Sequence, residues 1–212
     1  DGPSGAGKGT ICRLAAKKVG FHLLDSGALY RITGVAGLRN DIDLDDAARI
    51  GKFAASLSIE FKSENDRTLV LVNGEDYTAA IRTEEAGMAA SKVAKHPEVR
   101  SALLQQQRDF AKAPGLVADG RDMGTVVFPN AALKIFLTAS AEERARRRVK
   151  QLEESGHAAD YQEVLRDIQR RDEQDSNRAS APLKPAEDAI ILDSTHLTID
   201  EVLQTVIEKI PG

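Results

Sequence analysis

A glycine-rich stretch at the start of the chain constrains the fold more than any other feature. It reads Gly2-Pro3-Ser4-Gly5-Ala6-Gly7-Lys8-Gly9-Thr10, which fits G-x-x-x-x-G-K with the hydroxyl residue displaced by one position. Such glycines let backbone N–H groups turn inward around phosphate groups at the start of a helix, here expected over residues 9–18. This loop normally follows a buried strand, so an α/β fold is predicted. Because the chain opens at Asp1, we expect that strand to precede it in the natural protein.

The loop predicts a nucleotide phosphate site. Lys8 would reach the β- and γ-phosphates of ATP, and the Thr10 hydroxyl would face a bound Mg²⁺. The alternative is a glycine-rich turn that happens to contain a lysine. Gly-Lys-Gly-Thr is typical of nucleoside monophosphate kinases, and a GTPase is disfavoured because the chain has no Asn-Lys-x-Asp motif.

The rest of the chain alternates short aliphatic runs with helical patterns, which predicts a mostly parallel central sheet flanked by helices. A helical stretch over 86–110 is broken near Pro97, and Asp160 is a candidate N-cap for a helix over 160–175. Capping boxes at 140–143 and 198–201 announce two more helices. The expected strands of the parallel sheet are 22–24, 116–118, 133–137 and 190–192.

One region departs from this alternation. Residues 57–63, 68–73 and 76–78 have the pattern of short antiparallel strands, joined by turns at Asn65-Asp66 and Asn73-Gly74. We interpret this region as a small inserted sheet. It is either a substrate-binding insertion or a surface excursion without a role.

Composition excludes several classes of protein. The net charge is −4 and aromatic residues make up only 4% of the chain, which argues against a nucleic-acid or anionic-membrane binder. Cys12 is the only cysteine, so neither an intrachain disulfide nor a cysteine-based zinc site can form. No apolar run approaches the length of a membrane span. A cytoplasmic protein is therefore expected.

A second set of charged residues follows two of the predicted strands. Asp119-Gly120-Arg121-Asp122 comes after 116–118, and Asp25-Ser26-Gly27 comes after 22–24. Carboxyl ends of strands are where open α/β sheets bind ligands. The first group could order Mg²⁺, grip phosphate and read a base, or it could be a charged turn that satisfies itself. Asp25 could equally cap a helix.

Two helical segments carry further candidates. Arg171, Asp175 and Arg178 share one helical face, although Asp167, four residues before Arg171, could make part of this face an exposed ion-pair ladder. In the basic helix, Glu142 and Glu143 account for two arginines by i,i+4 spacing. No acid is in register with the remaining two, Arg144 and Arg148, so these are the better candidates for polyphosphate contacts.

Taken together, five blocks resemble bacterial cytidylate kinases almost from end to end. They are 2–10, Leu-Leu-Asp-Ser-Gly-Ala-Leu-Tyr-Arg (23–31), Ile-Arg-Thr (81–83), Asp-Gly-Arg-Asp-Met-Gly-Thr-Val-Val-Phe-Pro (119–129) and Arg-Arg-Asp-x-x-Asp-x-Asn-Arg (170–178). The resemblance implies a P-loop three-layer fold. It also implies a kinase core over 1–56 and 86–212, a monophosphate-binding insertion over 57–85 and a lid at about 144–160.

The resemblance also assigns roles by position. It implies transfer of the γ-phosphoryl group of ATP to CMP or dCMP with Mg²⁺, with Lys8, Arg121 and Arg178 as the catalytic set. The CMP phosphate would be held by Arg31 and Arg121, the cytosine by Ser26, Arg100, Asp122 and Arg178, and the sugar by Ser91, Arg171 and Asp175. No obligate protein partner is expected, and the chain should act as a monomer. The rivals are a P-loop kinase with another acceptor and a non-catalytic ATP-binding regulator.

Overall fold

The protein is described by a computed structural model that covers residues 1–64, 67–154 and 156–211. The chain divides into two compact units, which are described separately. Unit 1 comprises Asp1–Leu24 and Phe110–Gly212, and unit 2 comprises Asp25–Asp109.

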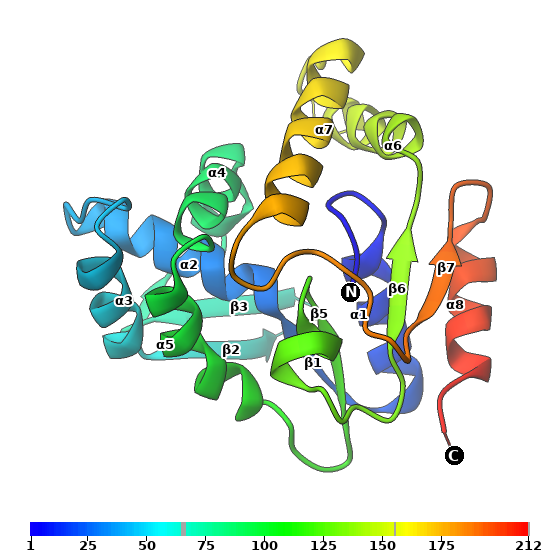
Figure 1. Cartoon of the computed structure of the whole chain (residues 1–212), viewed down its shortest axis with the longest axis horizontal. Helices are drawn as coiled ribbons and strands as arrows, with labels where there is room; N and C mark the ends of the chain where they lie inside the picture. The colour runs from blue at the N-terminus through cyan, green and yellow to red at the C-terminus, as the bar shows by residue number, and fades with distance from the viewer. Residues whose placement is uncertain (65–66, 155, 212) are drawn as a thin grey trace. The chain divides into compact units, whose positions relative to one another are not determined.

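The strands of unit 1 lie close to where the aliphatic runs predict them. They are β1 (His22–Asp25), β5 (Leu116–Asp119), β6 (Ile135–Thr138) and β7 (Ile190–Asp193). β6 and β7 pair in parallel with Ile135 opposite Ile190, and β1 pairs with β5 (Figure 1). The backbone nitrogen of Asp1 donates to Ile135 and its carbonyl accepts from Leu137, so this residue is hydrogen-bonded along β6. The predicted α/β class with parallel pairing is confirmed.

The helices of unit 1 also follow the sequence signals. They are α1 (Lys8–Val19), α6 (Ala141–Glu154), α7 (Tyr161–Asn177) and α8 (Ile199–Glu208), with a short π-helix over Met123–Val127 that the sequence did not predict. Ser140 and Asp160 accept hydrogen bonds from Glu143 and Glu163, and Thr198 forms the full capping box with Glu201. These caps satisfy N–H groups that a helix start leaves without partners.

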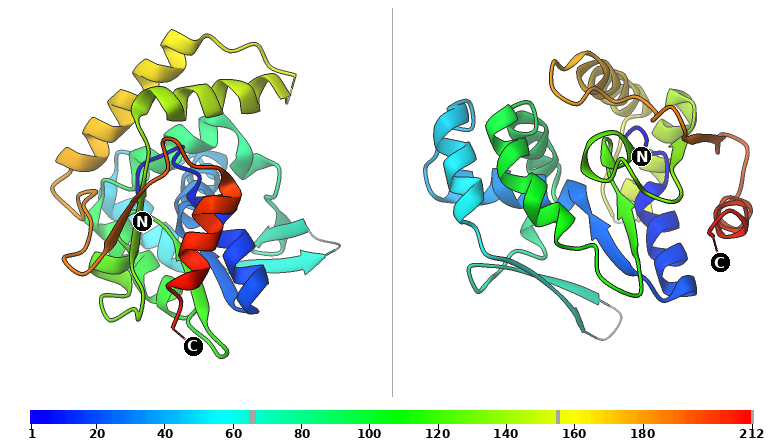
Figure 2. Two further views of the ribbon diagram at one scale, coloured as in Figure 1. Left: turned by 90° about the vertical axis from the view of Figure 1, so that its right-hand side faces the viewer. Right: turned by 60° about the horizontal axis from the view of Figure 1, so that its bottom comes forward.

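The core of unit 1 joins the glycine loop to the sheet. Ala6, Ile11, Leu137 and Val202 form one buried cluster, which connects the loop and α1 with β6 and α8. Helices α6 and α7 run side by side (Figures 1 and 2). Through this cluster, residues near the start of the chain and residues of β6 and α8 together hold the glycine loop in place.

Unit 2 combines helices with the small antiparallel sheet. Its helices are α2 (Ser26–Arg39), α3 (Ala47–Ser56), α4 (Glu84–Val93) and α5 (Pro97–Arg108), with a 3₁₀ turn over Ala80–Arg82. α4 and α5 confirm the predicted break near Pro97, which occupies the first turn of α5. No sequence pattern predicted α3.

The antiparallel sheet is the predicted insertion sheet. β2 (Ile59–Glu64), β3 (Arg67–Val72) and β4 (Glu75–Asp76) pair in chain order. Asn73 and Gly74, at φ 51° and 87°, form the second predicted turn in the conformation that Asn-Gly favours. The first predicted turn, Asn65-Asp66, lies outside the described residues.

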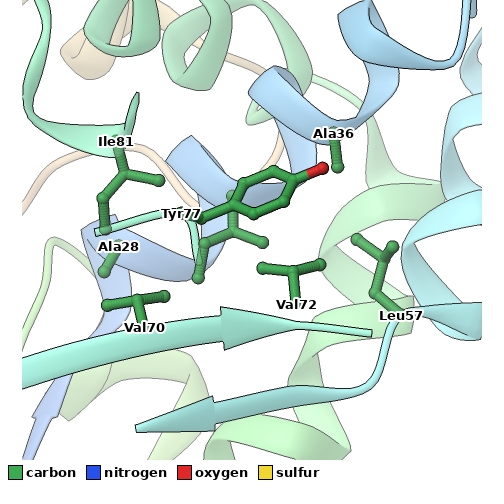
Figure 3. Packing of buried hydrophobic residues seen from close by; sticks show 8 residues of the cluster. Ala28, Ala36, Leu57, Val70, Val72, Tyr77 and Ile81 are labelled. Atoms are coloured by element: carbon green, nitrogen blue, oxygen red, sulfur yellow. The ribbon is translucent and has the colours of Figure 1, made fainter. Parts of the chain in front are cut away.

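Val70 and Val72 on β3, together with Tyr77, pack against α2, and Figure 3 shows the Tyr77 ring lying between that helix and the strand. The helices of unit 2 pack in pairs, α2 on α4 and α3 on α5. Gly34 allows the first contact, because a Cβ there would lie 2.7 Å from the Cβ of Ala89 on α4. Within the described residues, no helix is both long and apolar enough to cross a membrane.

Candidate functional site

The glycine loop approaches β6 so closely that Gly2 has no room for a side chain. A Cβ on Gly2 would lie 2.0 Å from the carbonyl oxygen of Leu137, so no other residue fits there. Gly7 caps α1 at φ 93°, in the left-handed region that glycine adopts without strain. α1 begins at Lys8, so the loop ends at a helix N-terminus, where backbone N–H groups favour an anion.

Lys8 lies between the loop and the end of β5. Its ammonium group donates to the Pro3 carbonyl at 2.9 Å and lies 4.0 Å from Oδ1 of Asp119. Only 11% of the Lys8 side chain is exposed. A Cβ on Gly9 would lie 3.5 Å from the other Asp119 oxygen. The predicted phosphate loop and the predicted 119–122 turn therefore meet at one carboxylate.

The 119–122 turn is fixed from two sides. The Asp1 carboxylate accepts N–H bonds from Met123 and Gly124, at 2.9 and 2.8 Å. Asp122, at the start of the π-helix, is only 5% exposed. Arg121 forms an ion pair with Asp175 on α7.

Asp175 also contacts Arg178. The Nη1 atom of Arg178 lies 3.4 Å from Oδ1 of Asp175, the carboxylate oxygen that does not face Arg121. The Arg178 Nε donates to the Ala181 carbonyl at 2.5 Å. One carboxylate thus joins two of the arginines predicted for CMP. Arg171 lies half-buried on the same helix, and Asp167 pairs with Arg170 on the exposed surface. Asp167 thus has an exposed partner three residues along the helix, whereas the spacing had pointed to Arg171, four residues along.

Arg144 is buried behind the glycine loop. It is 4% exposed, donates to the carbonyls of Ala139 and Ser4 at 2.9 and 3.0 Å, and forms a two-pronged pair with Asp172 on α7 at 3.0 and 2.6 Å. A Cβ on Gly5 would lie 3.3 Å from the Cβ of Arg144. Helical spacing offered no acidic partner for Arg144 on α6, and its partner, Asp172, lies on α7.

Of the neighbouring arginines of α6, Arg147 pairs with Glu143 at the predicted i,i+4 spacing, whereas Arg146, which the spacing assigned to Glu142, pairs with Glu143 at i,i+3. Arg146 and Arg147 both pair with Glu143, at 2.8 and 3.0 Å. Glu143 thus accounts for both arginines, one at i,i+3 and one at i,i+4. Burial opposes ionisation of Glu143, but the two arginines outweigh it and lower the pKa of its carboxyl group. Arg148 contacts Gln151 at 2.9 Å near the exposed surface.

Four predicted CMP contacts lie in unit 2. Ser26 opens α2 behind Asp25, which caps the helix by accepting from the N–H of Ala28. The Ser26 hydroxyl donates to Gln107 at 2.7 Å. Arg31 and Ser91 are exposed on α2 and α4.

Arg100 is held by backbone and ring contacts within unit 2. Its Nε donates to the Ala94 carbonyl at 2.7 Å, and its guanidinium carbon lies 5.4 Å from the Tyr30 ring centroid. A cation over an aromatic ring is attracted by the ring's negative face. The Tyr30 ring therefore helps to fix this predicted cytosine contact.

The family model for cytidylate kinase matches residues 1–212. The chain belongs to the cytidylate kinase family. The cytidylate kinase of Saccharophagus degradans is 61% identical over 208 residues, covering 98% of this chain and 93% of that protein. Those of Aeromonas hydrophila subsp. hydrophila and Vibrio parahaemolyticus are 58% and 56% identical, with 98% and 99% of this chain and 90% and 93% of theirs covered. The crystal structure of TT1252 from Thermus thermophilus matches with a TM-score of 0.45 at 20% identity over 100% of this chain and 95% of that one.

Each of the two units holds part of the predicted site. Unit 1 holds the loop, Arg121, Asp122, Arg144, Arg148, Arg171, Asp175 and Arg178, and unit 2 holds Ser26, Arg31, Ser91 and Arg100. Sequence reasoning missed three residues that orient them: Asp1, Gln107 and Asp172. The side-chain contacts that they make with the site residues and the turn join positions 28 to 123 apart in the chain, so no local spacing could reveal them.

Proposed function

We propose that the glycine loop and the charged residues of the two units carry out the phosphorylation of CMP or dCMP by ATP. As a member of the cytidylate kinase family, the chain transfers the γ-phosphoryl group of ATP to CMP or dCMP and releases ADP with CDP or dCDP. The observation that supports the residue roles best is the position of Lys8. It joins the phosphate loop to the Asp119 carboxylate, at the end of β5.

The transfer needs positioning and charge neutralisation more than covalent chemistry. The attacking oxygen of CMP is already anionic, so no general base is required. Lys8 would leave the Pro3 carbonyl and neutralise the β- and γ-phosphates, while the N-terminus of α1 stabilises the same charge. The residues from Gly2 to Thr10 would surround the phosphates of ATP.

The oxygen atoms of Thr10 and Asp119 fit Mg²⁺. Among the described residues, no three His, Cys, Asp or Glu side chains are placed to hold a metal ion by themselves. Mg²⁺ commonly keeps waters and takes one or two protein oxygens together with substrate phosphates. The Thr10 hydroxyl and the Asp119 carboxylate would supply those oxygens. Bound Mg²⁺ would neutralise part of the charge on the transferring group.

On the acceptor side, Arg31 and Arg121 would hold the CMP phosphate. Arg121 is paired with Asp175, so a bound phosphate would have to share its guanidinium group with that carboxylate. Asp122 would accept from the exocyclic amine of cytosine, which uracil lacks. Ser26, Arg100 and Arg178 would complete the base contacts, and Ser91, Arg171 and Asp175 the sugar contacts.

The remaining assignments follow the same proposal. Arg148 would reach ATP from α6. Arg144 would shape the loop through the Ser4 carbonyl, while its direct contact with ATP stays a prediction. We also propose residues 57–85 as the monophosphate-binding insertion and about 144–160 as the lid. Ser155 of that segment lies outside the described residues. A monomer in the cytoplasm stays a prediction.

The deciding measurement is ADP release from ATP and Mg²⁺ with CMP, dCMP, UMP and AMP as separate acceptors. Strong turnover with CMP and dCMP supports the proposal, whereas ATP binding without acceptor-dependent turnover contradicts it. In Arg121→Ala, we expect kcat/KM for CMP to fall by on the order of a hundredfold, because a charge-neutralising group is lost. Arg146→Ala is the matched control, since Arg146 is exposed and pairs with Glu143. Its kcat/KM should stay within about twofold, because an exposed pair contributes little.

A further inference from the structure

The Ser26 hydroxyl group has a fixed hydrogen-bond direction. Its oxygen lies 2.7 Å from Oε1 of Gln107, and both residues are buried, with 3% and 1% of their surface exposed. The Gln107 side chain also donates through Nε2 to the carbonyl oxygen of Leu103, at 3.3 Å, one turn earlier in α5. All three residues lie in unit 2.

The second contact decides which way the amide faces. The Leu103 carbonyl oxygen can only accept, so it must meet the amide nitrogen of Gln107. The amide oxygen then faces Ser26, and an oxygen of this kind cannot donate either. The Ser26 hydroxyl must therefore donate its single hydrogen to Gln107. Toward any further group, the Ser26 oxygen can act only as an acceptor.

We infer that Gln107 is a positioning residue that sets the hydrogen-bond polarity of Ser26 and thereby favours an amine over a carbonyl on the bound base. This inference rests on the proposed function, in which Ser26 contacts cytosine. The exocyclic amine of cytosine donates, whereas the corresponding oxygen of uracil accepts. A uracil oxygen would face an acceptor that has no hydrogen to offer, which leaves two buried acceptors without a donor.

The test is the ratio of kcat/KM for CMP to kcat/KM for UMP in Gln107→Met, which removes both polar ends of the amide at similar volume. A freed Ser26 hydroxyl could turn and donate to uracil, so the ratio should fall about three- to tenfold, the value of one ordinary hydrogen bond. Both substrates are measured on one preparation, so a partly unfolded sample does not alter the ratio. Gln105→Met is the matched control, because Gln105 is exposed on the same helix and donates to Asp109. Its ratio should not change.

Two further variants separate positioning from a structural role. If Gln107 acts through Ser26, then Gln107→Met should not lower the ratio further in a Ser26→Ala background. Gln107→Glu keeps an acceptor for Ser26 and should retain the CMP preference, which also provides a test if Gln107→Met does not fold.

An unchanged ratio in Gln107→Met, an equal fall in the Ser26→Ala background, or a lost preference in Gln107→Glu would overturn the inference. So would a Ser26→Ala enzyme that discriminates as well as the wild type, since Ser26 would then not read the base. Absence of CMP turnover in the wild type would instead overturn the proposed function.

Discussion

The pair between Arg144 and Asp172 offers the sharpest test of the site's construction. In Asp172→Ala, the Arg144 guanidinium group stays buried and keeps only the Ala139 and Ser4 carbonyls among the partners described above. Removing one partner of a fully buried ion pair costs about 3–5 kcal/mol. Water can replace part of the lost carboxylate, because the Asp172 side chain is 28% exposed. We therefore expect a loss of about 2–3 kcal/mol in the free energy of unfolding.

For a protein of this size, such a loss lowers Tm by roughly 4–12 °C. Thermal unfolding followed by circular dichroism measures the shift. The matched control is Asp167→Ala on the same helix, whose pair with Arg170 is exposed on both sides, at 54% and 64%. That variant should lose less than about 1 kcal/mol. Equal shifts in the two variants would refute the reasoning. Because Arg144 also holds the Ser4 carbonyl, KM for ATP should rise in Asp172→Ala alone.

Three further predictions concern other parts of the chain. Lys8→Ala should lower kcat by at least about a hundredfold while Tm changes little, since in the proposed mechanism its ammonium group neutralises developing charge; unchanged turnover would contradict the assignment. Gly34→Ala should destabilise the protein by about 1–3 kcal/mol in urea unfolding, because the added Cβ would lie 2.7 Å from Ala89; an unaltered midpoint would show that α2 and α4 separate freely. Two lysines that hydrogen-bond to Asp45 lower the pKa of its carboxyl group from 3.8 to about 2, so its contribution is complete above pH 3.8 and is lost as pH falls toward 2. Unfolding measured across that window should therefore depend less on pH in Asp45→Asn than in the wild type.

Much of the fold could be predicted because its signals are local. The aliphatic runs that became β1, β5, β6 and β7 and the caps at Asp160 and Thr198 involve residues within a few positions of each other. The Asn73-Gly74 turn is equally local, since such a turn needs positive φ at both central residues and Asn and Gly adopt it readily. α3 was missed, although Asp46 caps it by accepting from the N–H of Arg49. That cap was a signal that sequence reasoning could have used.

The site was less accessible to sequence reasoning because its partners come from distant segments. Helical spacing counts only acids on the same helix, so it could not find Asp172 for Arg144. Nor could it find Gln107 for Ser26, which lies 81 positions away. Resemblance to the family located the candidate residues, but their orientation depends on neighbours that only the folded chain brings together.

Within unit 1, Asp1 connects the glycine loop, proposed to bind ATP, with the turn at Asp122, proposed to contact CMP. Its backbone is bonded along β6 directly before the glycine loop, and its carboxylate holds the N–H groups that follow Asp122. A shift of the glycine loop would therefore reach the turn at Asp122 through Asp1, in addition to the contact of Lys8 with Asp119. Binding free energies coupled in this way are reciprocal, so whatever factor ATP imposes on the affinity for CMP, CMP imposes on the affinity for ATP.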